Sequence, residues 1–342
     1  MSTVEGAGVP TLSVVMPNYN HGRYLRAALG AIVAQSLQPL EVLVIDDGST
    51  DDSVAILREI EAKHAVVRVL VNERNMGPSA TLNRGFREAA GQFINVTSAD
   101  DQILPGFYEK TMTLLGRNAG AKLCIVDLAQ FHAVTGRVRY LRPRLRREAG
   151  FVSAEEVKQC LARRRAHAYG GMTIFERETL LRFGGFPPEL RWYGDWFTVL
   201  VLALRHGACY VPEALTTMRM LPGAYAAAGS KNAAVQDGLF RLIFDRLRSG
   251  DCADVGAAIA ESGALCLLGS QILRVLTREA EYRRLLSARL VARLAANVPV
   301  TALGLNEATE SPVGWVDRAV RGALGLDDRI QKYGVQLDRA DG

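Results

Sequence analysis

The first hundred residues alternate between short apolar runs and stretches with helical spacing. Four apolar runs predict buried strands, at 12–16, 41–45, 66–71 and 92–96. Between them, apolar residues recur every three or four positions, which predicts helices over 24–37, about 50–63 and 78–90. Ser49 or Thr50 is the expected cap of the second helix. Strands that alternate with helices of this length are typical of an α/β fold, a mainly parallel sheet with helices on both faces.

The pattern changes further along the chain. It predicts a helix from Pro105, a strand over 121–127, a hairpin turn at Thr135-Gly136, a strand over 172–175 and a helix over 195–205. Beyond about residue 222, Ala, Leu and Arg dominate and only helical spacing remains. We therefore predict a Rossmann-like domain over 10–222 and a helical C-terminal subdomain over 223–342.

Composition excludes several classes of protein. The 342 residues include 49% hydrophobic and 23% charged side chains, which is ordinary for a folded globular chain. No apolar run is long enough to span a membrane, and the first residues lack the features of a signal peptide. Five widely spaced cysteines suggest neither a zinc site nor a disulfide framework. We expect a cytoplasmic protein, with peripheral contact at the inner face of the cell membrane left open.

Polar clusters follow three of the predicted strands, at 17–20, 46–52 and 98–101. Because the carboxyl ends of parallel strands meet at one edge, the clusters can line one crevice. Tyr19 can stack on a base and Asp47 can accept a hydrogen bond from it. Paired carboxylates such as Asp100 and Asp101 repel each other unless a proton or a divalent cation intervenes. The pattern predicts a nucleotide diphosphate site, although each cluster alone also fits a turn with a helix cap.

Neither of the common phosphate-binding loops follows the first strand. The sequence has no GxGxxG at that point and no Walker A motif, which disfavours a dinucleotide cofactor and a P-loop ATPase.

The ordered set of motifs resembles the family 2 glycosyltransferases, which have the GT-A fold, from Leu12 to about Met220. The motifs are Ser13-Val-Val-Met-Pro-Asn-Tyr-Asn20, Val44-Ile-Asp-Asp-Gly-Ser-Thr-Asp51, Asn75-Met-Gly77, Leu82-Asn-Arg-Gly85, Ser98-Ala-Asp-Asp101, Gly184-Gly-Phe186 and Trp192-Tyr-Gly-Asp-Trp196. The resemblance implies transfer of a sugar, with inversion, from a nucleotide-diphosphate donor to a saccharide or lipid-linked acceptor. A UDP-sugar is the favoured donor.

The resemblance also implies roles for individual residues. The expected nucleotide-binding residues are Pro17, Tyr19, Asn20, Asp47, Arg84 and Asp100. Asp100 and Asp101 would hold Mn²⁺ or Mg²⁺, and Asp195 would be the general base that deprotonates the acceptor hydroxyl. Arg219 is a weaker candidate for the diphosphate. Asn83 is expected to bond backbone atoms at the sheet edge.

Three positions depart from the family pattern. Ser98 stands where an acidic residue is frequent in the metal motif, and Gly194 stands where an acidic residue often precedes the base. Leu221 stands where many members have a histidine two residues after the arginine that matches Arg219. The Gln-x-x-Arg-Trp signature of processive synthases is absent, which favours addition of a single sugar.

Other readings stay open. The departures at Ser98 and Leu221 are compatible with a degenerate sugar-nucleotide-binding or scaffolding subunit. A nucleotidyltransferase is disfavoured because no glycine-rich basic loop follows the first strand. Six arginines crowd one short stretch, at positions 137, 139, 142, 144, 146 and 147, and could contact phosphate groups or anionic lipid headgroups. We expect no nucleic-acid partner, and the C-terminal helices could pack as a cap or form a homo-oligomer.

Overall fold

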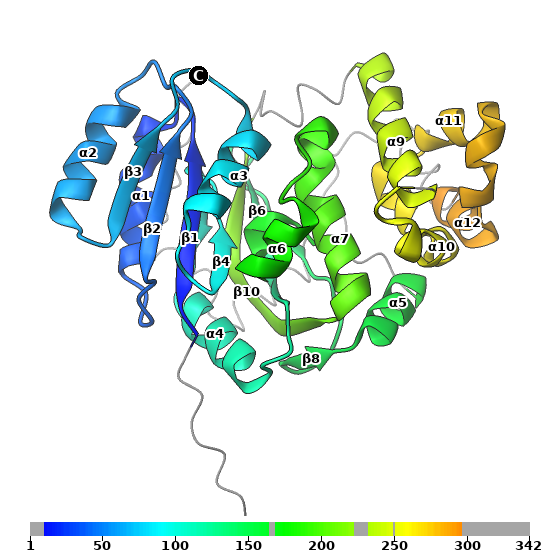
Figure 1. Cartoon of the computed structure of the whole chain (residues 1–342), viewed down its shortest axis with the longest axis horizontal. Helices are drawn as coiled ribbons and strands as arrows, with labels where there is room; N and C mark the ends of the chain where they lie inside the picture. The colour runs from blue at the N-terminus through cyan, green and yellow to red at the C-terminus, as the bar shows by residue number, and fades with distance from the viewer. Residues whose placement is uncertain (1–9, 164–167, 222–231, 249, 296–342) are drawn as a thin grey trace, which may run out of the picture.

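The computed structural model describes residues 10–163, 168–221, 232–248 and 250–295, and its centre is a ten-stranded sheet (Figure 1). The strands are β1 (Leu12–Asn18), β2 (Glu41–Asp46), β3 (Val67–Val71), β4 (Phe93–Val96), β5 (Gln102–Ile103), β6 (Leu123–His132), β7 (Val138–Leu141), β8 (Gly150–Val152), β9 (Thr173–Glu176) and β10 (Ala208–Met220). Their order is β3-β2-β1-β4-β9-β6-β10-β5, with β7 beside β6 and β8 beside β10.

The directions of the strands show at which edge of the sheet most of them end. β1, β2, β3 and β4 are mutually parallel, and β6 is parallel to β10. β9 is antiparallel to both of its neighbours, β4 and β6, so β6 and β10 run in the same direction as β1 to β4. The long strands therefore all end at one edge, and β9 begins there. This confirms the α/β class and the mainly parallel, Rossmann-like sheet of the GT-A fold.

Helices pack on the sheet and continue beyond it. The first set is α1 (Gly22–Val33), α2 (Ser53–Lys63), α3 (Pro78–Glu88), α4 (Phe107–Arg117), α5 (Ala154–Arg163), α6 (Arg177–Phe183) and α7 (Gly194–His206). In Figure 1, α3 and α6 lie in front of the sheet and α1 lies behind it. Short 3₁₀ turns precede β9 (η1, Gly170–Met172) and α7 (η2, Pro188–Tyr193).

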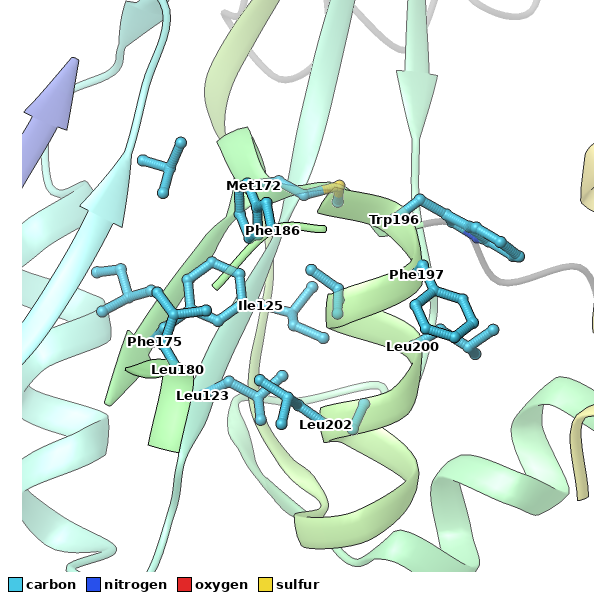
Figure 2. Packing of buried hydrophobic residues seen from close by; sticks show 14 of the residues in the cluster. Leu123, Ile125, Met172, Phe175, Leu180, Phe186, Trp196, Phe197, Leu200 and Leu202 are labelled. Atoms are coloured by element: carbon cyan, nitrogen blue, oxygen red, sulfur yellow. The ribbon is translucent and has the colours of Figure 1, made fainter. Parts of the chain in front are cut away.

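α7 is the most deeply buried helix of the first set, with ten buried residues among its thirteen. Figure 2 shows side chains from the strands, among them Ile125 and Phe175, gathered beside this helix, with Trp196 at its N-terminal end. Burying one large apolar side chain such as Phe197 stabilises the fold by about 1.5–3 kcal/mol. The N-terminal end of α7 is therefore held firmly against the sheet.

After β10, the described residues form helices and no strand. They are α9 (Ala233–Arg248), α10 (Ala253–Ser262), α11 (Ile272–Arg278) and α12 (Ala288–Ala295), and in Figure 1 they lie beyond α7. The boundary predicted near residue 222 adjoins residues that the structure does not describe. The part of the predicted subdomain beyond residue 295 also lies outside the described residues. The division into two domains therefore stays a prediction. Among the described helices, none combines the length and the hydropathy needed to cross a bilayer.

Local details differ from the sequence predictions. The cap predicted at Ser49 or Thr50 is wrong: α2 begins at Ser53, and Asp51 Oδ1 accepts the Ser53 N–H at 3.0 Å. Ser49 instead donates its hydroxyl to Asp46 Oδ2 at 2.7 Å. The first helix ends at Val33, earlier than predicted. The predicted hairpin at residues 135–136 is confirmed, because β6 and β7 pair on either side of it.

Candidate active site

The loops after β1 and β2 are joined by side-chain hydrogen bonds. Asn18 at the end of β1 donates Nδ2 to Asp46 Oδ2 at 2.7 Å, and both side chains are buried. Asn20 accepts the Thr50 N–H on Oδ1 at 2.8 Å. Its backbone lies in the left-handed region, with φ +55°, which asparagine tolerates better than most residues. Asn20 therefore fixes the two loops to each other.

Asp47 organises the next loop. Its buried carboxylate accepts Asn72 Nδ2 at 2.7 Å, Met76 N–H at 2.9 Å and Gly77 N–H at 2.8 Å. Arg84 donates Nη1 to Asn72 Oδ1 and to the Val71 carbonyl. Arg84, Asn72 and Asp47 thus form one chain of hydrogen bonds. A carboxylate can accept about four hydrogen bonds, so Asp47 keeps acceptor capacity for a ligand.

Two further residues of the first cluster remain accessible. Tyr19 is 42% exposed and Pro17 is half-buried, directly beside the Asn18–Asp46 pair. An exposed aromatic ring next to a rigid polar loop offers a face on which a base can stack. The sequence prediction for Tyr19 is compatible with this position.

Asp100 and Asp101 lie at the same edge, after β4. Asp101 Oδ1 accepts the Arg219 N–H of β10 at 2.8 Å, and Arg219 Nε donates to the Asp100 carbonyl at 3.3 Å. Burial, together with the neighbouring Asp100 charge, raises the pKa of Asp101 well above its ordinary value. The Ser98 hydroxyl contacts Asp101 by a hydrogen bond that acts in the opposite direction. His21 Nδ1 lies 3.9 Å from Asp100 Oδ1.

These two carboxylates fit a divalent cation in the manner of magnesium or manganese sites. Such ions are commonly held by one or two carboxylates, with water and substrate phosphates completing the shell. Within the described ranges, no three His, Cys, Asp or Glu side chains converge as a complete protein-only site. A cation at Asp100 and Asp101 would therefore need further oxygen ligands from water or from a bound substrate.

Asp195 reaches the same edge by a different route. It lies in the first turn of α7, and its Oδ2 accepts the Gly170 N–H at 3.0 Å, while Oδ1 accepts the Trp196 N–H at 2.7 Å. Gly170 opens the turn before β9, and β9 begins at the edge where β1, β2 and β4 end. A Cβ on Gly170 would lie 3.0 Å from the ring of Phe186 and 3.2 Å from Asp195 Cβ. The glycine allows the close approach of the two segments.

Burial shapes the electrostatics around Asp195. Loss of solvation raises the pKa of Asp195 above its ordinary value of 3.8, although the N–H groups of Gly170 and Trp196 act against that shift. Burial and the charge of Asp195 also raise the pKa of Tyr169 to about 12, whereas Arg139 acts in the opposite direction. A carboxylate with a raised pKa is a better proton acceptor than an ordinary aspartate, which suits a general base.

The structure also contains contacts that the sequence analysis missed. Asn72 bridges Arg84 and Asp47. It directly follows β3, so the search for polar residues after predicted strands, which identified the other clusters, could have found it. Gly170 had no sequence signal. Asn83 is confirmed as a backbone-bonding residue, because its side chain bonds the Phe186 carbonyl at 2.8 Å and N–H at 2.9 Å. Trp196 is 4% exposed and packs in the core.

Comparison with known proteins gives a consistent result. The model for glycosyl transferase family 2 matches residues 13–182. The uncharacterised glycosyltransferase YibD of Escherichia coli is 38% identical over 103 residues, which cover 30% of each chain. A GalNAc(5)-diNAcBac-PP-undecaprenol beta-1,3-glucosyltransferase of Campylobacter jejuni is 30% identical over 99 residues, 29% of this chain and 32% of that enzyme. The chain thus spans about a third of the length of these curated relatives.

Solved structures share the fold over a longer stretch. S. aureus TarS 1–349, in complex with UDP-GlcNAc, matches with a TM-score of 0.66 at 18% identity, covering 84% of this chain and 85% of that one. The mannosyltransferase PcManGT of Pyrobaculum calidifontis, in complex with GDP-Man and Mn²⁺, matches with a TM-score of 0.52 at 18% identity, covering 97% and 85%. At these identities the likeness establishes the fold.

Proposed function

The chain belongs to glycosyl transferase family 2, and from this premise we propose that it transfers one sugar from a nucleotide-diphosphate donor to a hydroxyl of a saccharide or lipid-linked acceptor, with inversion. The supporting observation is that Asp195, Asp47 and Asp100 belong to segments that meet at one edge of the sheet. Two solved structures that share this fold, one in complex with UDP-GlcNAc and one with GDP-Man, support a nucleotide-sugar donor. A UDP-sugar is the donor we favour.

The donor side of the proposed site would hold the nucleotide. Tyr19 would stack on the base beside Pro17, and Asp47 would accept a hydrogen bond from the base edge. Asn20 would act by fixing the loops after β1 and β2, since its side chain bonds the backbone of residue 50. Arg84, fixed through Asn72, would direct its remaining N–H groups toward the diphosphate.

Asp100 and Asp101 would hold Mn²⁺ or Mg²⁺ together with the donor diphosphate. When bound, the ion would neutralise the negative charge that develops on the departing nucleoside diphosphate. Asp101 already accepts hydrogen bonds from the Arg219 N–H and from Ser98, so the Asp100 carboxylate would be the more available ligand. The PcManGT complex with Mn²⁺ supports a divalent cation in a protein of this fold.

Asp195 would act as the base. It would take the proton from the acceptor hydroxyl as that oxygen attacks the anomeric carbon on the face opposite the leaving group. The hydrogen bonds from Gly170 and Trp196 hold the carboxylate in place, and burial keeps its affinity for the proton high. A single in-line displacement of this kind inverts the anomeric centre.

The test is thermal unfolding of the full chain with a panel of nucleotides and nucleotide sugars, with Mn²⁺ or with chelator. Binding to the folded state raises the free energy of unfolding by mass action, by about 2.7 kcal/mol at a ligand concentration of one hundred times Kd, and so raises the thermal midpoint. A rise with one nucleotide, larger with Mn²⁺, together with turnover or hydrolysis of the matching nucleotide sugar, is the expected result. Nucleotide binding without any turnover would favour the degenerate binding subunit. No rise with any nucleotide would overturn the proposal.

A further inference from the structure

The arginine segment over 137–147 is a strongly charged surface that the donor site and the base do not use. It comprises β7 and the loop that follows, and all six arginine side chains are exposed. Among the described residues, Arg139, Arg144 and Arg147 form no salt bridge with a carboxylate. Arg142 lies 3.7 Å from Asp127, measured from Nε to Oδ2. The charge of Arg144 also acts on Asp127, so this one buried carboxylate faces two arginines and the segment keeps a net positive charge.

Several arginines of the C-terminal helices are paired with protein carboxylates. Their salt bridges join Arg241 to Glu279 at 2.7 Å, Arg246 to Asp251 at 2.6 Å and Arg274 to Asp237 at 2.6 Å. Those guanidinium groups connect one helix or turn to another and are neutralised by protein carboxylates.

The segment is also anchored, unlike an ordinary solvated loop. Asp127 on β6 and Tyr210 on β10 are 4% and 1% exposed, and the Tyr210 hydroxyl donates to Asp127 Oδ1. The same hydroxyl accepts the Arg144 N–H at 3.1 Å. Arg144 has φ +51°, a left-handed backbone that a non-glycine residue adopts only where its surroundings hold it. The buried pair fixes the position of this arginine.

The loop after β7 lies near α7, the helix that carries the proposed base. Pro143 and Leu145 line a small apolar cavity together with Ala168 and Trp196. Those last two residues are the sequence neighbours of Tyr169 and Asp195. Arg139 is close enough to Tyr169 for its charge to oppose the effect of Asp195 on that tyrosine. β6 continues beyond the residues that pair with β9, and β7 pairs with this continuation. β7 therefore lies at the edge of the sheet where β9 begins.

We propose that Arg139 and Arg144 form a subsite for a phosphate group of the acceptor and hold the acceptor next to Asp195. The inference rests on the proposed function and names its acceptor class. The planar guanidinium fork matches phosphate oxygens and forms charge-assisted hydrogen bonds with them. The donor diphosphate has its own partners at Asp100 and Asp101, so this positive surface serves the other substrate.

The test uses the full chain with its nucleotide and Mg²⁺ at saturation, so that the donor site is filled. Two probes carry the phosphate: methyl phosphate in solution, and vesicles of phosphatidylcholine with or without phosphatidylglycerol. The variant Arg139→Ala/Arg144→Ala is compared with Arg87→Ala/Arg117→Ala, which removes the same charge from exposed arginines of α3 and α4 that also form no salt bridge among the described residues. Thermal midpoints show whether both variants fold.

Wild type and the control variant are expected to bind a phosphate probe, and the double variant at Arg139 and Arg144 is expected to weaken that binding about tenfold or more, since charge-assisted hydrogen bonds are lost. A response to methyl phosphate assigns a soluble phosphate-bearing acceptor, and a response to phosphatidylglycerol vesicles alone assigns a lipid headgroup. Equal binding by the two variants, or no binding of either probe by wild type, would overturn the subsite. Nucleotide affinity is measured separately: its absence in wild type would count against the proposed function instead.

Discussion

The donor side and the base side of the edge are built in different ways. On the donor side, side chains at the ends of neighbouring parallel strands bond one another: Asn18 with Asp46, and Asp47 with Asn72. On the base side, Asp195 is held by Gly170, which is 25 residues away along the chain and precedes an antiparallel strand. The donor side follows from local motifs and sheet topology, whereas the base side requires the packing of α7.

The two sides also use their carboxylates differently. Asp47 accepts three hydrogen bonds from the loop over 72–77, so much of its role is to hold that loop. Asp195 accepts two hydrogen bonds and is half-buried, and the loss of solvation raises its pKa. The comparison separates a carboxylate that holds a loop from one whose raised pKa suits the proposed role of base.

The largest expected effect is on the base side. Asp195→Asn should lower kcat by about 10²–10⁴, because the amide cannot accept the acceptor proton. Nucleotide affinity, measured by titration, should stay near wild type, since the amide oxygen can still accept a backbone N–H. Glu178→Gln, an exposed carboxylate of α6, is the control. Loss of nucleotide binding together with turnover would show that Asp195 supports the donor side instead.

On the donor side, the expected loss is one of stability. Asp47→Ala leaves Asn72 Nδ2 and the N–H groups of Met76 and Gly77 without their acceptor, and should lower the free energy of unfolding by about 2–4 kcal/mol. Asp51→Ala removes the acceptor of only two N–H groups, those of Gly22 and Ser53, and should cost less, about 1–2 kcal/mol. Denaturant unfolding measures both. Equal losses would mean that the loop does not depend on Asp47.

The metal side of the donor site should respond more moderately. Asp100→Ala should weaken Mn²⁺-dependent nucleotide binding about tenfold, a loss of about 1.4 kcal/mol, because one of two neighbouring carboxylates is removed. The measurement is nucleotide titration with Mn²⁺ and with chelator, and Glu59→Ala on α2 is the control. An unchanged response to Mn²⁺ in the Asp100 variant would remove this residue from the proposed metal site.

The smallest effect concerns pH. Because only the ionised base accepts a proton, and burial raises the pKa of Asp195, the acid limb of kcat should lie above the ordinary value of 3.8. The raised pKa also makes the free energy of unfolding depend on pH. The stabilisation from protonated Asp195 is complete below the pKa of the unfolded state and is lost as pH rises through the pKa of the folded state. Asp195→Asn should abolish that part of the pH dependence in unfolding measurements. An acid limb at or below 3.8, at saturating donor, would contradict a base whose pKa is raised by loss of solvation.

The sequence predicted much of the fold because periodicity and strand-ending residues are local signals. β1, β2, β3 and β4 and the helices between them lie close to their predicted positions, and the three polar clusters do meet at one edge. The antiparallel direction of β9 was not predicted, since a short apolar run does not reveal its partners. The cap at residues 49–50 was wrong because the Ser49 hydroxyl bonds Asp46, a partner that only the folded loop provides.

The sequence by itself therefore determined the α/β class, the family resemblance and the residue types of the proposed donor site. These depend on side-chain period and on motifs within single loops. Only the tertiary structure decided that Gly170 holds Asp195, that Asn72 links Arg84 to Asp47, and that the Asp127–Tyr210 pair anchors Arg144. Such contacts join residues far apart in the chain, and their existence depends on which strands pair and which helix packs across them.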